Sequence, residues 1–250
     1  MNASLASRQP ITEGNLVPTA VMLAMKIVVA DDHPLFRIAL VQALRDLTGG
    51  KAPVEASSLR TLEEAVQAHS DIDLILLDLH MPGARGFSSL VFLRGERPEI
   101  PVIVISSNDH PRTIRRAQQF GAAGFIPKSA PVERMLEAVR HVFDGGIWFP
   151  ALAAEKSEED ARLAAKLAQL TPQQMRVLMC MADGLLNKQI AYELGLAENT
   201  VKVHVTAILR KLECHGRTQV ALLVKALEPD PPPERDAALG DDSNAARDES

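Results

Sequence analysis

The chain has 250 residues, of which 46% are apolar and 24% charged, and its formal net charge is −5. With a mean hydropathy of +0.00, these fractions are typical of an ordinary globular protein and do not indicate disorder overall. The length allows one large domain or two modest ones, and two are expected. No apolar run approaches the ~18 residues that span a bilayer, and the N-terminus lacks the pattern of a signal peptide, so we expect a cytoplasmic protein without a membrane partner. Two cysteines without Cys-x-x-Cys spacing predict neither a disulfide framework nor a zinc site.

The charge is distributed unevenly along the chain. Residues 166–228 carry 8 Lys and Arg against 5 Asp and Glu, which leaves a net charge of +3. Residues 229–250 carry 2 against 7, which leaves −5. A polyanion would therefore be attracted mainly by residues 166–228.

Residues 1–24 show no sustained periodicity and are predicted to be a flexible leader. Apolar strands and helical patterns then alternate over residues 25–146, which predicts a doubly wound, five-stranded parallel sheet of the α/β, flavodoxin-like class. The strands are predicted at 27–30, 53–56, 74–77, 101–105 and 124–126. The helix that follows the first strand has apolar positions at Leu35, Ile38, Ala39, Val41, Leu44 and Leu47. The helix that follows the fourth strand is expected to expose three basic residues, Arg112, Arg115 and Arg116.

The second part of the chain is different in character. Residues 147–167 are rich in Ala and acidic residues and are interpreted as a linker that is partly helical. Thr171-Pro172 with Gln174 predicts a capping box that opens a small all-α domain over residues 168–228. The prolines that begin at Pro229 end regular structure, and residues 229–250 are predicted to be a disordered acidic tail.

Polar residues follow four of the apolar strands and should meet at one edge of the sheet, because the carboxyl ends of parallel strands share an edge. Three carboxylates placed together repel, which raises a pKa or requires a cation, and an all-oxygen set suits Mg²⁺. A lysine and a hydroxyl opposite them suit phosphoryl transfer, with a carboxylate as covalent acceptor. Singly, each residue could be a helix cap or a solvated charge, but together they favour a functional site. These residues are Asp31, Asp32, Asp78, Ser106 and Lys128.

The motifs Asp31-Asp32-His-Pro, Asp78-Leu-His-Met-Pro, Val-Ile-Ser106-Ser and Phe125-Ile-Pro-Lys128 resemble those of the receiver domain of two-component response regulators. The resemblance implies that Asp78 accepts a phosphoryl group from a sensor histidine kinase. It implies that Mg²⁺ is held by Asp31, Asp32, Asp78 and the backbone of His80. It also implies that Lys128 pairs with the phosphoryl group, while Ser106 and Phe125 form a switch pair.

The resemblance implies no enzyme beyond the domain's own aspartyl phosphorylation and dephosphorylation. An aspartyl-phosphate hydrolase also places its nucleophile after a strand. That mechanism needs a second carboxylate two residues later as general acid. His80 stands at that position, which argues against such a hydrolase.

Two helices joined through Gly195 suit a helix-turn-helix, whose second helix enters the major groove of DNA. The second helix, over about residues 198–212, has an apolar stripe that would face the core. The other side offers partners for bases and phosphates, although a solvated face of any helical bundle would show similar residues. This side carries Lys202, Val203, Thr206 and Arg210, flanked by Lys188, Thr200 and Lys211.

Residues 168–227 resemble the LuxR-type output domain through Leu170-Thr-Pro, Gly184-Leu-Leu-Asn-Lys-Gln-Ile-Ala and Asn199-Thr-Val-Lys-Val-His-Val. The resemblance implies that Lys202, Val203 and Thr206 face bases, and that Lys188, Thr200 and Lys211 reach phosphates. It also implies that the last helix pairs two subunits, although packing on its own domain is the alternative. The residues concerned are Val220, Leu223, Val224 and Leu227. Ala197 stands where a serine or threonine usually caps the DNA-reading helix.

The two resemblances together predict a two-component response regulator of the NarL/FixJ type. It would be a transcription factor that is phosphorylated on Asp78 and forms a homodimer on phosphorylation or DNA binding. Its partners would be a sensor histidine kinase and double-stranded promoter DNA. The alternative is a receiver-controlled protein-interaction regulator that does not bind DNA.

Overall fold

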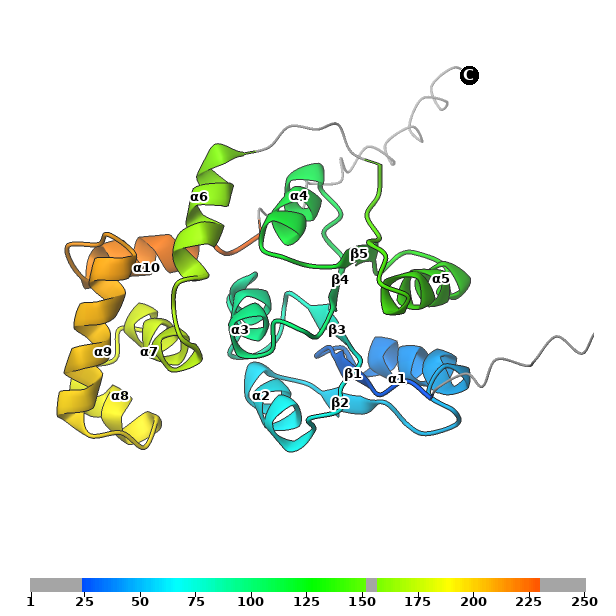
Figure 1. Ribbon diagram of the computed structural model, residues 1–250, viewed down its shortest axis with the longest axis horizontal. Helices are drawn as coiled ribbons and strands as arrows, with labels where there is room; N and C mark the ends of the chain where they lie inside the picture. The colour runs from blue at the N-terminus through cyan, green and yellow to red at the C-terminus, as the bar shows by residue number, and fades with distance from the viewer. Residues whose placement is uncertain (1–23, 152–156, 230–250) are drawn as a thin grey trace, which may run out of the picture.

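The computed structural model describes residues 24–151 and 157–229 (Figure 1). The predicted leader and the predicted acidic tail lie outside the described residues, except for one residue of each. The described residues form a parallel sheet in the strand order β2-β1-β3-β4-β5, which confirms the doubly wound α/β fold. The strands are β1 Ile27–Ala30, β2 Val54–Ala56, β3 Leu74–Asp78, β4 Val102–Ser106 and β5 Gly124–Pro127.

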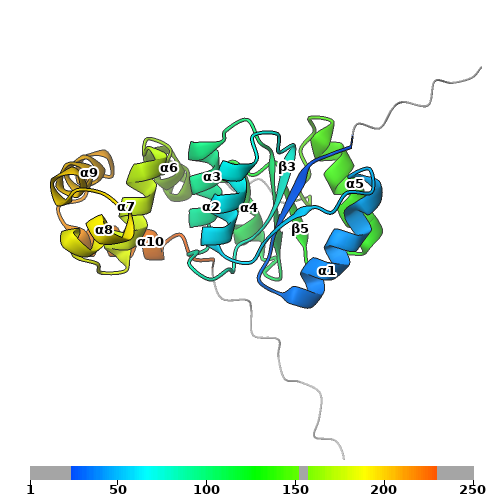
Figure 2. The ribbon, with the colours of Figure 1, turned by 90° about the horizontal axis from the view of Figure 1, so that it is seen from below.

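Helices cover both faces of the sheet (Figure 2). Strands β1, β3 and β4 are buried at every residue, because apolar side chains pointing to either face meet a helical layer. Val28 and Ala30 face one core, and Ile27 and Val29 face the other. The first core lies under three helices, α2 Leu59–Ala68, α3 Ser88–Glu96 and α4 Pro111–Gln119. The second core lies under two helices, α1 Pro34–Ala43 and α5 Val132–Phe143.

Helix α1 differs from the sequence prediction. Leu35 and Ile38, predicted on its apolar face, are 84% and 58% exposed. The buried side is Leu40, followed by Leu44 and Leu47, with Phe36 packed against the same core. These residues recur at spacings of three or four, so the helix turns Leu35 and Ile38 away from the sheet.

The chain pairs with the sheet again after α5. Trp148, in the predicted linker, forms a parallel bridge with Gly124 at the β5 edge. The Trp148 backbone N donates to the Ala123 carbonyl at 3.0 Å, and the Phe125 backbone N donates to the Trp148 carbonyl at 2.7 Å. The first residues of the linker thus cover the edge strand. Helix α6, Glu158–Leu167, occupies the later described part of the linker.

The remaining described helices form a small helical domain beside the sheet domain (Figure 1). Its capping box is confirmed, because the Thr171 side chain accepts from the Gln174 backbone N and the Gln174 side chain accepts from the Thr171 backbone N. None of the helices in the described ranges has the length and apolar character that crossing a bilayer requires. The helices are α7 Pro172–Ala182, α8 Asn187–Glu193, α9 Glu198–Lys211 and α10 Arg217–Lys225.

The cap of α9 leads to a stability prediction. Ala197 has the extended backbone of an N-cap residue, φ −72° and ψ 143°, but alanine has no side-chain oxygen to accept from the first turn. We expect Ala197→Ser to raise the free energy of unfolding by about 1 kcal/mol. Urea denaturation of the full chain measures this change. Thr171→Ala, which removes a formed cap, should lower it by a similar amount, and an unchanged midpoint for Ala197→Ser alone would contradict the prediction.

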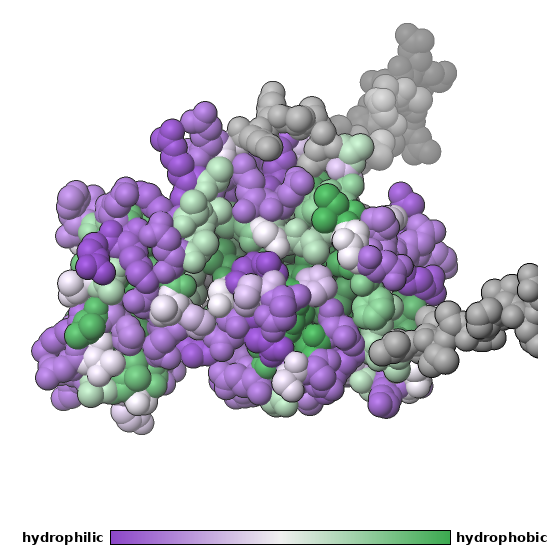
Figure 3. Space-filling view, in the orientation of Figure 1, coloured by the Kyte–Doolittle hydropathy of each residue, from purple (hydrophilic) through white to green (hydrophobic). Residues whose placement is uncertain are grey.

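The helical domain packs on the α2–α3–α4 side of the sheet domain. Helix α7 contacts α3, and α6 contacts α4, as Figure 1 shows. One continuous apolar cluster joins the two domains and includes Phe87, Phe92, Met175 and Leu227. In Figure 3, hydrophilic residues dominate this face, and weakly hydrophobic residues follow α6. The alanines of α6 line a groove against Val91 and Phe120.

Candidate functional site

The strand ends bring the predicted polar residues to one edge of the sheet. Asp78 is the last residue of β3 and is 1% exposed, and Asp31 follows β1 directly and is 2% exposed. Ser106 ends β4 and pairs in register with Pro127 of β5. The Lys128 backbone N donates to the Ser106 carbonyl at 2.8 Å, so ladder pairing places Lys128 at the same edge.

Lys128 joins two buried carboxylates. Its Nζ lies 2.7 Å from Asp78 Oδ2 and 2.8 Å from Asp31 Oδ2. Burial raises the pKa of Asp78, and the contact with Lys128 partly opposes that shift. For Lys128, burial alone would lower the pKa, but the contacts with Asp31 and Asp78 outweigh it and the pKa is raised. Lys128 therefore keeps its positive charge in the pocket at neutral pH.

The pocket has the ligand chemistry that a hard divalent cation requires. Asp31, Asp32, Asp78 and His33 each offer one ligand atom, and these atoms lie within 4.8 Å of one another. Carboxylate oxygens are the ligands that Mg²⁺ prefers. The His80 backbone N donates to Asp78 Oδ1 at 3.2 Å and orients that carboxylate.

The structure adds His33, which sequence analysis left without a role. The His33 Nδ1 lies 2.7 Å from Asp32 Oδ1 and 3.3 Å from Lys128 Nζ. The one feature of the sequence that could have indicated a role in the pocket is its position directly after Asp31 and Asp32. The side chain is 64% exposed, so it sits at the mouth of the pocket.

Ser106 and Phe125 lie on neighbouring strands, and both are fully buried. The Asn108 backbone N donates to Ser106 Oγ at 3.2 Å. The Phe125 ring is already directed inward in this structure, and its backbone is covered by the bridge to Trp148. In the ladder, Phe125 pairs with Val104 and Ser106 pairs with Pro127, so Ser106 and Phe125 stand two positions apart on neighbouring strands.

The predicted DNA-facing residues separate into two groups. Lys202, Val203, Thr206 and Arg210 line one shallow groove on α9, and Lys188 and Thr200 are exposed nearby. This helix lies on the side of the helical domain that is remote from the sheet domain (Figure 2). Lys211 is different, because its Nζ donates to the Gln169 carbonyl at 2.8 Å and to Gln174 Oε1 at 2.7 Å. In this arrangement Lys211 stabilises the start of α7.

The predicted pairing residues of α10 are mostly buried in this structure. Val220, Val224 and Leu227 are fully buried in the core of their own chain, so these three have no surface to offer a second subunit in this arrangement. Leu223 is partly buried. Leu222, which the prediction omitted, is 64% exposed. A domain this small needs one side of α10 to complete its own core.

Each of the two parts of the chain matches a known protein family. Residues 27–140 match the response regulator receiver domain family, and residues 168–224 match the luxR family of bacterial regulatory proteins. The chain is 43% identical over 206 residues to a glycerol metabolism activator of Pseudomonas putida, covering 79% of this chain and 93% of that protein. It is 34% identical over 203 residues to the nitrate/nitrite response regulator protein NarL of Escherichia coli strain K12, covering 79% and 94%.

Among solved structures, an RcsB response regulator of Salmonella typhimurium is similar at a TM-score of 0.48 and 20% identity, covering 82% of this chain and 99% of that chain. The assignment rests on the two family matches and on the identity with the curated relatives over nearly their full length. The chain belongs to the two-component response regulators of the NarL type, transcription regulators that join a receiver domain to a LuxR-type helix-turn-helix domain.

Proposed function

We propose that Asp78 is the phosphoacceptor and that a sensor histidine kinase supplies the phosphoryl group. The observation that carries this proposal is a buried Asp78 carboxylate 2.7 Å from the Lys128 ammonium, with two further carboxylates within 4.8 Å. An Asp78 oxygen forms a bond to phosphorus as the bond from phosphorus to the kinase histidine nitrogen breaks. The imidazole leaves and takes up a proton. The domain catalyses only this phosphorylation and its hydrolysis.

The charge balance of the pocket supports a divalent ion. Lys128 alone cannot neutralise Asp31, Asp32 and Asp78 together with an incoming phosphoryl group. The three carboxylates and the backbone carbonyl of His80 would hold Mg²⁺, which, when bound, neutralises charge on the phosphoryl oxygens. Lys128, whose Nζ lies 2.7 Å from Asp78 Oδ2, would pair with the phosphoryl group.

Phosphorylation of Asp78 leads to binding of promoter DNA by a homodimer. Lys202, Val203 and Thr206 would contact base edges, and Lys188, Thr200 and Arg210 would contact phosphates. The helical domain has a small positive charge, so pairing two copies on one DNA doubles the phosphate contacts that one copy makes. The exposed Leu222 and the neighbouring Leu223 of α10 are the surface for that pairing. Since its partner is chromosomal DNA, the protein acts in the cytoplasm.

A mobility-shift titration on genomic promoter fragments tests this function. With acetyl phosphate and Mg²⁺, the full chain should bind its target fragment at least about tenfold more tightly than without the phosphodonor, because a dimer engages two half-sites. Binding should weaken steeply as salt is raised. Failure to bind any fragment in either state would overturn the DNA-binding function.

A matched pair of variants distinguishes DNA binding from the alternative, a protein-interaction regulator that does not bind DNA. Lys202→Ala with Thr206→Ala should abolish the shift. Lys225→Ala removes the same charge from an exposed position on α10 and should leave most of the binding. If target genes remained regulated in cells that carry Lys202→Ala with Thr206→Ala, the protein-interaction alternative would be favoured.

A further inference from the structure

The groove on α9 that is proposed to bind DNA is open in this structure. It is lined by Lys202, Val203, Thr206 and Arg210, and all four side chains are exposed. The sheet domain contacts α6 and α7 instead, and α9 lies on the remote side of the helical domain (Figure 2). No described residue covers the groove, so its positive charge is accessible to any polyanion.

The cations of this groove are among the least neutralised in the helical domain. Lys188 on the neighbouring helix α8, Arg210 and Lys225 are exposed and make no ion pair or side-chain hydrogen bond with a described residue. Lys202 pairs only with Glu198 of its own helix, at 3.0 Å, with side chains 55% and 47% exposed. Solvent screening makes such a pair weak. Lys188, Lys202 and Arg210 therefore offer a cluster of charge to an anionic ligand.

The C-terminal segment of the chain has the opposite charge. Residues 230–250 lie outside the described residues, and their sequence has 2 Arg against 7 Asp and Glu. Residues 1–165 carry 17 Lys and Arg against 20 Asp and Glu, a net charge of −3. That part of the chain therefore repels the segment as a whole, whereas the helical domain, with its net charge of +3 over residues 166–228, attracts it.

One basic residue of the sheet domain lies beside the end of α10, and its charge is already balanced. Arg116 was predicted to be exposed, but it is 3% exposed. Its Nε lies 3.1 Å from Asp160 Oδ1 of α6, and its Nη1 donates to the Glu228 carbonyl at 2.9 Å. Helix α6 and the end of α10 pack over it, which the periodicity of α4 alone does not reveal. Arg116 therefore adds little positive charge to the surface from which the C-terminal segment departs.

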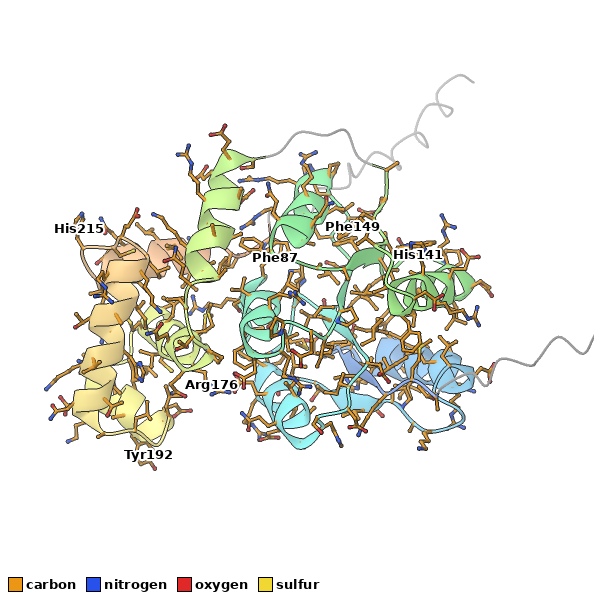
Figure 4. The ribbon with its side chains drawn as sticks, viewed as in Figure 1. Phe87, His141, Phe149, Arg176, Tyr192 and His215 are labelled. Atoms are coloured by element: carbon orange, nitrogen blue, oxygen red, sulfur yellow. The ribbon has the colours of Figure 1, made fainter. Side chains whose placement is uncertain are left out.

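The segment departs on the side of the helical domain opposite to the groove. The Phe87 backbone N donates to the Leu227 carbonyl at 3.0 Å, so the end of α10 lies against the sheet domain. Figure 4 labels Phe87 where the two domains meet and His215, which follows α9, on the far side of the helical domain. An acidic residue must therefore pass around the helical domain to reach the groove.

The length of the segment decides which of its acidic residues can make that passage. A domain of about 60 residues is roughly 27 Å across, and an extended chain spans at most about 3.5 Å per residue. The first group of acids lies within 7 residues of Pro229, a reach of about 25 Å. The second group begins 12 residues after Pro229, a reach of about 40 Å or more. We call the first group, Asp230, Glu234 and Asp236, the proximal acids, and the second, Asp241, Asp242, Asp248 and Glu249, the distal acids.

We propose that the distal acids occupy the α9 groove in the DNA-free protein and compete with DNA phosphates for Lys188, Lys202 and Arg210. The proposal rests on the proposed function, because it takes α9 as the helix that binds DNA. Phosphorylation of Asp78 has no part in this competition. The segment lowers the affinity of every copy of the chain for DNA.

The competition is intramolecular, which sets its strength. A tether of this length gives an effective concentration of about 1 mM. Carboxylates should bind the groove no more tightly than non-specific DNA does, with a Kd of about 0.1 mM. The groove would then be free at least about a tenth of the time, so DNA affinity falls by up to about tenfold. The factor is the same for target and unrelated DNA, because the segment blocks the groove and changes no contact with a base.

Two full-length variants, each lacking three charges of the segment, test the competition by DNA binding. Fluorescence anisotropy with a labelled unrelated duplex, without phosphodonor, should show at least about threefold tighter binding for the distal variant at about 50 mM salt. The proximal variant should change the affinity by less than about 1.5-fold, and the gain of the distal variant should disappear by about 300 mM salt. Equal gains from both variants would mean repulsion by net charge and would overturn the proposal. The distal variant is Asp241→Asn, Asp242→Asn and Asp248→Asn, and the proximal variant is Asp230→Asn, Glu234→Gln and Asp236→Asn.

Amide NMR spectra of the same three DNA-free proteins locate the contact. The amide signals of Lys202, Thr206 and Arg210 should shift between the wild type and the distal variant, and stay in place between the wild type and the proximal variant. Unshifted α9 signals, or shifts confined to Lys225 or to Arg115 on α4, would overturn the proposal, as would α9 shifts without the gain in DNA affinity when the wild type binds DNA.

The same data distinguish this proposal from the proposed function. If the α9 signals shift but neither the wild type nor the variants bind target or unrelated DNA, DNA binding fails and the contact between the distal acids and α9 stands. If the wild type binds DNA while the shifts and the gain are both absent, the contact fails and DNA binding stands.

Discussion

Asp78→Asn is expected to reduce incorporation of phosphoryl groups from acetyl phosphate by at least about a hundredfold, because a neutral amide is a poor nucleophile toward phosphorus. The substitution keeps the size of the side chain, so a site that is 1% exposed can remain packed. Radiolabelled acetyl phosphate with Mg²⁺, followed by gel electrophoresis, measures the incorporation. Chelation of Mg²⁺ should suppress labelling of the wild type as well.

The control for this experiment is Asp144→Asn, which changes an exposed carboxylate at the end of α5 and should leave labelling unchanged. The acid lability of an acyl phosphate distinguishes it from a phosphoserine. Full labelling of Asp78→Asn would show that another residue accepts the group. The assignment of Asp31, Asp32 and Lys128 to a phosphorylation pocket would then be rejected as well.

Lys128→Met is expected to lower the free energy of unfolding by about 3 kcal/mol at neutral pH without Mg²⁺. Methionine keeps most of the volume but leaves Asp31 and Asp78 buried without their shared cation. Urea denaturation of wild type and variant measures the difference. Saturating Mg²⁺ should reduce the deficit, because an ion held by the carboxylates restores positive charge and binds only the folded state.

The loss of unfolding free energy caused by Lys128→Met should depend on pH, and the direction follows from the pKa of Asp78. Burial raises the pKa of Asp78 even with Lys128 in place, and loss of the lysine should raise that pKa further. A carboxylate whose pKa is raised on folding destabilises the fold above that pKa and no longer does so once it is protonated. The deficit should therefore be full at neutral pH and shrink as the pH falls below the raised pKa of Asp78.

A double variant identifies the cause of the Lys128→Met deficit. Asp31→Asn combined with Lys128→Met removes one of the two carboxylates that lost their cation, and it should recover part of the lost stability. A deficit that is independent of pH and Mg²⁺, and that Asp31→Asn does not change, would mean that Lys128 acts through packing alone.

Sequence analysis was most reliable where local chemistry and sequence order decide the outcome. Apolar runs bounded by turn residues predicted the strands, and the rule that parallel strands end at one edge predicted that Asp31, Asp78, Ser106 and Lys128 lie together. The Thr171 capping box was confirmed for the same reason, since both hydrogen bonds join residues three positions apart. His33 could not be assigned in this way, because its position after two aspartates does not show whether its side chain points toward the pocket or away from it.

The sequence by itself determined the fold class, the edge of the sheet where the pocket lies, and the helix on which the residues proposed to face DNA stand, because each depends on periodicity or on neighbours along the chain. Only the tertiary structure decided which apolar or charged residues are buried. Leu35 and Ile38 are exposed, Val220 and Val224 complete the core of their own domain, and Arg116 is covered by α6 and α10. The physical reason is that burial depends on which distant segment packs against a helix face, and periodicity along one helix does not contain that information.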